Sequence, residues 1–259
     1  MKVTAFVGSA RKKHTYNTTL KFLKNLEESG NVDTEIISLA DYNLNICRGC
    51  KLCLDRGEER CPLKDDRDLL LTKMKESDGV IFASPNYSFQ VSGQMKVFID
   101  RLGFFLHRPM FFGKTYTSIV AQGVYGGKNI VKYLDLIGSA MGFNCIKGMC
   151  INTLEPMPED AEAKIDRKIQ KLSSKFYHQL VRREYPKPSL FKLMIYRMSR
   201  TSMKLMQDDS FRDYRYYTEK GWFESDYYYP VKLNPLKRVV GWIFDRLARK
   251  MAVQEGVQQ

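Results

Sequence analysis

Short apolar strand patterns alternate with helical patterns along the first 185 residues, and this alternation most restricts the fold. The uninterrupted apolar run at 79–83 is typical of a strand buried on both faces of a parallel sheet. A long helical pattern at 159–183 closes the series. Five strands alternating with helices predict an α/β doubly wound parallel sheet with right-handed crossovers. The predicted strands are residues 2–7, 34–38, 79–83, 115–120 and 144–149.

Three polar loops, at 8–18, 84–92 and 121–127, follow the first, third and fourth predicted strands. In doubly wound sheets, ligands bind beyond the carboxyl ends of the strands. The first loop places hydroxyl, amide and cationic side chains before a helix expected to begin near Leu20, a combination that suits phosphate. It matches neither GxxxxGK[ST] nor GxGxxG. The alternative is a basic solvated loop with Asn17 or Thr18 as N-cap.

Four of the six cysteines are crowded into one polar segment with no hydrophobic period, spaced C-x2-C-x2-C-x7-C. Thiols at every third residue can point to one centre, as in iron-sulfur and other metal sites. The last of them is followed by Pro62, as in the bacterial ferredoxin run, which favours a [4Fe-4S] cluster. Zinc, usually held by two separated ligand pairs, and thiols without metal are the alternatives. The four are Cys47, Cys50, Cys53 and Cys61.

The charge balance is strongly basic, with 42 Lys and Arg against 29 Asp and Glu and a net charge of +13. Such a balance suits nucleic acid, anionic membranes or anionic cofactors. Because the basic residues are scattered and no nucleic-acid-binding motif accompanies them, a zinc-stabilised nucleic-acid-binding protein is only the non-redox alternative. No apolar run approaches the ~18 residues of a spanning helix, and the first stops at Gly8, short of a signal peptide. We expect a cytoplasmic protein.

The composition changes after residue 185, so we expect domains at 1–185 and 186–259, with the cysteine insertion at 46–66 in the first. The second region holds seven of the fifteen tyrosines and both tryptophans. One helix is expected from Ser189 to about Met206. Asn234 as N-cap and Pro235 predict another, with an apolar stripe and basic residues along 236–251. Such a helix can lie on an anionic membrane or pack on its own or a neighbouring protomer.

The stretches GSARKKHTYNT, SPNYSFQVSGQMKVFIDR and QGVYGG, after the first, third and fourth strands, resemble the flavodoxin-like NAD(P)H-dependent FMN reductase superfamily. With the cysteine run, the chain looks most like the iron-sulfur flavoprotein branch. The resemblance covers about the first 185 residues and implies strand order 2-1-3-4-5. It departs from the branch at Cys61, where a shorter interval is usual.

The resemblance implies that the first loop binds the FMN phosphate, the second lies along the flavin ring and the third completes the ring site. It implies an enzyme in which NAD(P)H reduces FMN and electrons pass to a [4Fe-4S] cluster at the four cysteines, or to a quinone, flavin, other small acceptor or electron-transfer protein. A non-catalytic electron carrier is the alternative. We expect no catalytic side chain, and a homodimer or homotetramer. The implied FMN-binding residues are Ser9, Arg11, Thr15, Tyr16, Asn17, Thr18, Pro85, Asn86, Tyr87, Ser88, Phe89, Gln122, Gly123, Tyr125, Gly126 and Gly127.

Overall fold

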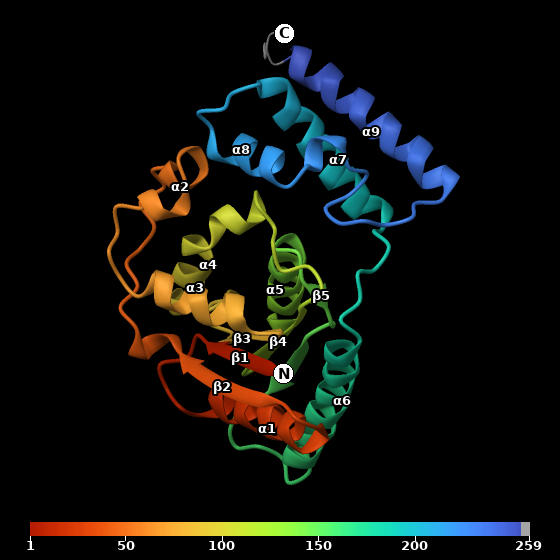
Figure 1. The fold of residues 1–259 in the computed structure, drawn as a ribbon. Helices are drawn as coiled ribbons and strands as arrows, with labels where there is room; N and C mark the ends of the chain where they lie inside the picture. The colour runs from red at the N-terminus through yellow and green to blue at the C-terminus, as the bar shows by residue number, and fades with distance from the viewer. Residues whose placement is uncertain (255–259) are drawn as a thin grey trace. The chain divides into compact units, whose positions relative to one another are not determined.

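The computed structural model describes residues 1–254, which form two compact units. The first unit consists of Met1–Arg48 and Leu63–Glu184. The second consists of Gly49–Pro62 and the chain from Tyr185 onward. Figure 1 labels helices α1 to α9 and strands β1 to β5. Most of the cysteine segment therefore belongs to the same compact unit as the C-terminal region.

A parallel sheet in the order β2-β1-β3-β4-β5 forms the centre of the first unit, with β6 also paired to β4. This confirms the predicted strand order and the doubly wound α/β fold. Val7 is level with Ala83, and Pro85 with Ala121, so β1, β3 and β4 end at one edge. The strands are β1 (Lys2–Val7), β2 (Asp33–Ser38), β3 (Gly79–Pro85), β4 (Thr115–Gln122), β5 (Asn144–Cys145) and β6 (Met149–Asn152).

The single strand predicted at 144–149 is wrong, because the chain forms two short strands there. Between them, the Gly148 N–H donates to Asp135 Oδ2 at 3.0 Å, and Ser118 Oγ donates to Asp135 Oδ1 at 2.7 Å. A Cβ on Gly148 would lie 2.0 Å from Ser118 Oγ, so only glycine allows this approach. The break lets β6 continue to Asn152 and adds another strand end at the edge where β4 ends.

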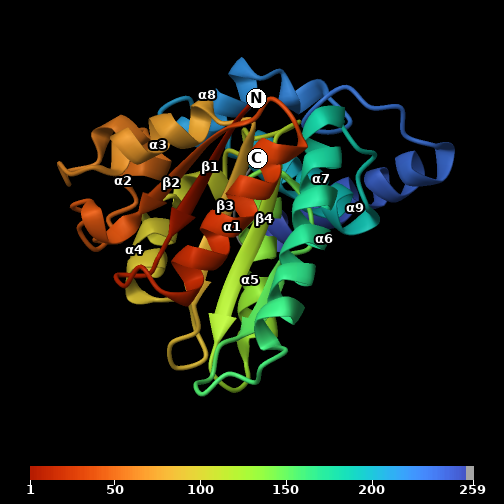
Figure 2. The same ribbon diagram turned by 90° about the horizontal axis from the view of Figure 1, so that it is seen from below.

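Helices cover both faces of the sheet (Figure 1, Figure 2). Phe22 and Phe176, from α1 and α6, pack on the face that carries Val3, Ala5 and Val7. The opposite face has an aromatic core of Phe6, Phe82, Phe98, Tyr116 and Phe143. The helices of this unit are α1 (His14–Ser29), α3 (Arg67–Glu76), α4 (Gly93–Arg101), α5 (Gly127–Ala140) and α6 (Ala161–Arg182), with 3-10 turns at Leu39–Asp41 and Gly103–Leu106.

Helix α1 begins at His14 rather than near Leu20, so the expected start was wrong. Its first turns bury Thr15, Thr18 and Thr19. The Thr19 hydroxyl donates to the Thr15 carbonyl at 2.8 Å, which satisfies a buried polar group within the helix. Because these inward residues are polar, the hydrophobic pattern does not reveal the first turns.

The second unit is helical and rich in aromatic contacts. Asn234 Oδ1 accepts from the Lys237 N–H at 2.8 Å and Ser189 Oγ from the Lys192 N–H at 3.2 Å, so both predicted helix starts are confirmed. The Tyr196 hydroxyl donates to the Trp222 carbonyl at 2.7 Å inside the aromatic core. No helix in the described residues is long and apolar enough to cross a membrane. The helices are α2 (Leu52–Asp55), α7 (Leu190–Met206), α8 (Arg212–Glu219) and α9 (Pro235–Gln254), with 3-10 turns at Glu58–Arg60 and Trp222–Glu224.

Candidate functional site

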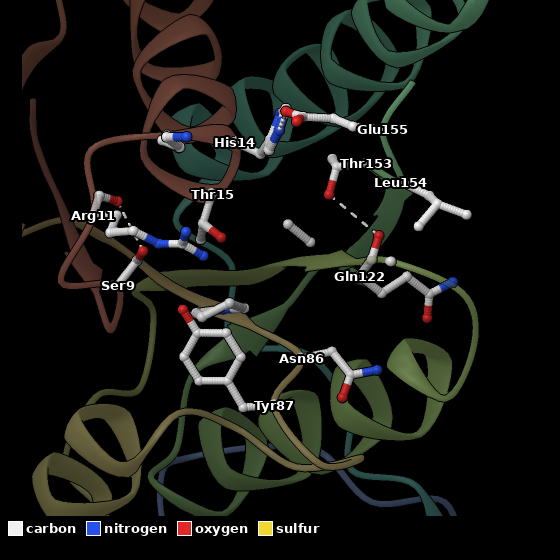
Figure 3. A pocket seen from close by; sticks show the side chains of 14 residues that line it. Ser9, Arg11, His14, Thr15, Asn86, Tyr87, Gln122, Thr153, Leu154 and Glu155 are labelled. Carbon is white, nitrogen blue, oxygen red and sulfur yellow. Dashed lines mark hydrogen bonds and ion pairs between the residues drawn. The ribbon is translucent and has the colours of Figure 1, made fainter. Parts of the chain in front are cut away.

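A pocket of about 420 Å³ lies at the carboxyl edge of the sheet, within the first unit (Figure 3). Its volume falls in the range of small-molecule and cofactor sites. Four segments build it, one after each of β1, β3, β4 and β6, as expected at the edge where parallel strands end. The lining residues are Ser9, Arg11, Lys13, His14, Thr15, Pro85, Asn86, Tyr87, Ala121, Gln122, Gly123, Thr153, Leu154 and Glu155.

The loop after β1 combines cations with the start of α1. Arg11 and Lys13 line the pocket, and Ser9 Oγ donates to the Arg11 carbonyl at 2.8 Å, which fixes the loop (Figure 3). No side chain caps α1 at Lys13, and its first turn holds no acidic residue. The positive end of the helix dipole therefore acts with two cations, an arrangement that favours a phosphate.

The loop after β3 presents an unpaired acceptor. The Asn86 N–H donates to the Ala121 carbonyl at 2.7 Å, and Asn86 Nδ2 donates to the Tyr125 carbonyl at 2.8 Å. Asn86 Oδ1 is buried and has no hydrogen-bond partner in the described chain. In Figure 3 the Asn86 amide is directed away from Arg11 and Thr15, so this side chain joins the loop after β3 to the loop after β4.

The same loop then turns sharply at Ser88 and Phe89. Both have positive φ angles, 50° and 64°, and Tyr87 and Gln90 exchange backbone hydrogen bonds of 3.0 Å. Positive φ at both central positions is the conformation of a type I′ turn, and it is strained for a bulky side chain. The turn directs Phe89 against Tyr125, with ring centroids 5.1 Å apart, while Tyr87 lines the pocket.

The loop after β4 is braced from within. Gln122 Oε1 accepts from the Gly127 N–H, and Gln122 Nε2 donates to Asn152 Oδ1, each at 2.6 Å. The Gln122 side chain therefore stabilises the loop and ties β4 to β6. Gly126 has a φ of 93°, and a Cβ there would lie 2.8 Å from Phe89 Cδ1, so the turn requires glycine.

The segment after β6 forms a wall that the sequence did not predict. The Thr153 N–H donates to the Gln122 carbonyl at 2.8 Å, and His14 Nε2 lies 3.1 Å from Glu155 Oε1 (Figure 3). We missed that the sheet continues beyond residue 149, because β6 pairs with β4 as far as Asn152. Treating 144–149 as one strand ended the sheet too early and left Thr153, Leu154 and Glu155 unassigned.

The structure brings half of the predicted cofactor residues to the pocket. Eight of the sixteen line it: Ser9, Arg11, Thr15, Pro85, Asn86, Tyr87, Gln122 and Gly123. The other eight lie outside the lining, on α1 or in the braced turns: Tyr16, Asn17, Thr18, Ser88, Phe89, Tyr125, Gly126 and Gly127. Within the loops, tight turns and helix periodicity decide which side chains can face the ligand.

The four clustered cysteines are not gathered into a ligand set. Cys47 and Cys50 are exposed, Cys53 lies on α2, and Cys61 follows a 3-10 turn and is half-buried. Among the described residues, no group of three or more Cys, His, Asp or Glu side chains is placed to hold a metal ion.

A buried ion pair anchors both ends of the cysteine segment to the first unit. Arg101 Nη1 and Nη2 donate to the Asp65 carboxylate, and Arg101 Nη1 also donates to the Asn45 carbonyl at 3.0 Å. The Asp65 carboxylate accepts from the N–H groups of Asn45 and Arg67. Burial alone would raise the pKa of Asp65, but these hydrogen bonds outweigh it and lower the pKa to about 2.

Asp65 and Asp66 directly precede α3, where N-capping side chains are common. Asp66 occupies the N-cap position, but its side chain does not cap the helix. Instead, Asp66 Oδ2 accepts from the Asn43 N–H at 2.7 Å. Together the two carboxylates join residues 43–45 to residues 65–67. They close the base of the cysteine segment, and Asp65 also accepts the N–H of Arg67, the first residue of α3.

Comparison with known proteins gives consistent matches. A family model described as NADPH-dependent FMN reductase matches residues 1–153. An iron-sulfur flavoprotein of Archaeoglobus fulgidus is 34% identical over 235 residues, which are 85% of this chain and 99% of that protein. An iron-sulfur flavoprotein of Methanocaldococcus jannaschii is 47% identical over 130 residues, 49% of this chain and 62% of that one. The solved structure of RosB shares the fold, with a TM-score of 0.56, 12% identity, and coverage of 91% of this chain and 92% of that chain.

Proposed function

Since this chain belongs to the NADPH-dependent FMN reductase family, we propose that it is an NAD(P)H-dependent oxidoreductase that holds FMN in the pocket at the carboxyl edge of the sheet. One observation carries the proposal: a cationic, uncapped helix start lines the same pocket as the polar loops after β3 and β4. FMN carries a phosphate for the helix start and a polar ring edge for the two loops.

The first loop would bind the phosphate. Arg11 and Lys13 supply positive charge, and the start of α1 adds backbone N–H groups and its dipole. Thr15 is buried in the first turn of α1 and lines the same wall. Tyr16, Asn17 and Thr18 follow on the helix and would set its position. A dianionic group fits this end of the pocket better than any other part of it.

The loops after β3 and β4 would hold the ring. Gly123 lets the backbone come close to the ring, because only Leu154 lies within 4 Å of a Cβ built there, and Asn86 fixes the loop after β4 through the Tyr125 carbonyl. Pro85, Tyr87 and Gln122 complete this part of the lining. When bound, FMN would supply the redox chemistry, since it accepts two electrons as hydride and releases them singly or together.

The remaining predicted residues would act by shaping these loops. Ser88 and Phe89 form the turn that positions Tyr87, and Phe89 packs on Tyr125. Gly126 and Gly127 make the turn that Gln122 braces. These residues would stabilise the ring site.

For the electron acceptor, we propose a small redox molecule such as a quinone or free flavin, or a [4Fe-4S] cluster at Cys47, Cys50, Cys53 and Cys61. The cysteine spacing and the printed names of the relatives support the cluster. Iron and acid-labile sulfide analysis of protein purified without oxygen separates the two: stoichiometric iron and sulfide support the cluster, and their absence leaves the small acceptor.

The visible spectrum tests the flavin proposal. Purified protein, reconstituted with FMN and freed of excess, is expected to absorb at about 450 nm and to bleach when NADH or NADPH is added anaerobically. Failure to retain FMN, or bound FMN that neither nucleotide reduces, would contradict the proposal.

A matched pair of variants tests the phosphate site. Loss of a charge-assisted hydrogen bond in Arg11→Gln is expected to weaken FMN binding by about 10- to 100-fold, from the ~1.5–3 kcal/mol of such bonds. Arg182→Gln, on the exposed end of α6, is the control and should bind normally. Riboflavin, which lacks the phosphate, should bind Arg11→Gln and the unaltered protein alike. Equal losses for riboflavin and FMN would mean that Arg11 does not contact the phosphate.

A further inference from the structure

Helix α9 is attached to α7 through a narrow inner face of small and acidic residues. Gly241, Asp245, Ala248 and Ala252 are buried and recur at the spacing of one helical face. Asp245 accepts from Arg200 at 2.9 Å, from Arg197 at 2.7 Å and from Thr201 at 2.7 Å, all on α7. This face is therefore fully used in holding α9 on the second unit.

The outer face of α9 exposes large apolar side chains, each 44–70% accessible. They form a stripe of helical period along the whole helix, and Trp242 stands at its edge. They are Leu236, Val239, Trp242, Ile243, Leu247 and Met251. Single exposed apolar residues are normal on a soluble protein, but six on one helix mark an interaction surface.

Every exposed charge on α9 is positive. Arg238, Arg246, Arg249 and Lys250 are exposed, and none forms an ion pair within the described residues. The one acidic residue of the helix, Asp245, is buried against α7. The Arg246 guanidinium lies over the Trp242 ring at 3.8 Å, so the cation and the indole share one patch.

We propose that the outer face of α9 binds an anionic lipid surface, lying in the plane of the membrane interface. An apolar stripe with a tryptophan, bordered by arginine and lysine, is the composition of interfacial helices. A second copy of the chain is the less fitting occupant, because two such faces would bring four cations against four cations with no exposed acid between them. Anionic headgroups neutralise the cations while the apolar stripe leaves water.

Sedimentation with lipid vesicles tests the proposal on the full chain with FMN bound. The protein is expected to pellet with vesicles of phosphatidylcholine and phosphatidylglycerol, more weakly with phosphatidylcholine alone, and less as salt increases. No binding, or equal binding to both vesicle types, would refute the proposal.

Variants separate the charged and apolar contributions. Arg246→Gln, Arg249→Gln and Lys250→Gln combined should weaken binding to the anionic vesicles on the order of a hundredfold, at about fivefold per cation. Ile243→Asp with Leu247→Asp should lower it by a similar factor. Leu136→Asp, on the exposed side of α5 in the first unit, is the matched control and should bind normally. FMN content and NAD(P)H oxidation should stay normal in all of them, so this test does not depend on the flavin site.

Tryptophan fluorescence gives a second readout. Trp242 is 50% exposed and Trp222 only 4%, so a blue shift on adding anionic vesicles reports Trp242 leaving water. Trp242→Phe should abolish the shift. If instead the unaltered protein self-associates in solution and Ile243→Asp abolishes the association, a second copy covers this face and the lipid proposal is wrong.

Discussion

Replacing Asp65 with asparagine is expected to destabilise the first unit at the base of the cysteine segment. The Asp65 side chain is 0% exposed and that of its partner Arg101 is 2% exposed. Asparagine keeps an oxygen that can accept from the Asn45 N–H, which the carboxylate now does at 2.9 Å. It removes the negative charge beside the buried Arg101 guanidinium. The variant therefore replaces an ion pair by a neutral contact while changing the shape of the side chain very little.

The expected cost follows from two independent considerations. The pKa of Asp65 falls from 3.8 to about 2 on folding, because the hydrogen bonds from Arg101, Asn45 and Arg67 outweigh the opposing effect of burial. At ~1.36 kcal/mol per pH unit, this corresponds to about 2.4 kcal/mol of stability near neutral pH. Breaking a buried ion pair on one side typically costs ~3–5 kcal/mol, because the partner charge stays buried. We therefore expect the free energy of unfolding to fall by about 2–5 kcal/mol.

Urea unfolding of the protein with FMN bound measures this cost, and Asp66→Asn is the matched control. Asp66 is the neighbouring residue, and its Oδ2 accepts one backbone N–H, from Asn43, which an asparagine oxygen can also accept. The control should lose less than about 1 kcal/mol, the size of an ordinary hydrogen bond. Equal losses for the two variants would show that the ion pair is not what holds the base of the segment.

The pH dependence provides a separate check. Because the folded pKa lies below the unfolded one, the contribution of Asp65 is complete above pH 3.8 and is lost as the pH falls toward about 2. About half of it should be gone at pH 3. The stability difference between the unaltered protein and Asp65→Asn should therefore narrow from pH 6 to pH 3. A difference that stays constant over this range would refute the assignment of the low pKa to Asp65.

Two further predictions test the thiols and the divided strand. Cys61→Ser is expected to abolish any bound iron and sulfide while FMN stays bound, as measured by metal analysis and the visible spectrum; loss of FMN as well would show that the segment is needed for the flavin site. Gly148→Ala should lower the urea midpoint by the equivalent of about 2 kcal/mol or more, because its Cβ would lie 2.0 Å from Ser118 Oγ and 2.5 Å from the Ser118 carbonyl oxygen. Gly93→Ala is the control, since nothing lies within 4 Å of a Cβ there, and it should be neutral or slightly stabilising.

The sheet could be predicted from the sequence because its central strands β1, β3 and β4 are buried on both faces. The run at 79–83 is continuously apolar, the run at 3–7 is interrupted only by Thr4, and all these residues are buried. Because each of the polar loops after β1, β3 and β4 follows the carboxyl end of a parallel strand, all three lie at one edge of the sheet. The two C-terminal helix starts were equally visible, because Ser189 and Asn234 cap them by local hydrogen bonds.

The missed features depend on contacts between distant residues. The early start of α1 rests on buried threonines that carry no hydrophobic signal. The division between β5 and β6 depends on Asp135, on α5, reaching the Gly148 backbone. The use of Asp65 as an ion-pair partner depends on Arg101, on another helix. Local sequence preferences do not show which polar groups are buried or which distant residues they contact. Prediction from the sequence therefore fails at these sites of tertiary contact.

Because the chain forms two compact units, flavin binding and the state of the cysteines can be considered separately. All the residues that line the pocket belong to the first unit, whereas Cys50, Cys53 and Cys61 belong to the second. The loops that form the pocket are braced by one another, through Asn86 to Tyr125 and Gln122 to Asn152, and none of these contacts involves the cysteine segment. Flavin binding should therefore persist whatever the thiols hold. A protein with FMN and no iron would leave the flavin proposal intact and reduce the cysteine segment to an insertion whose base is held by Asp65.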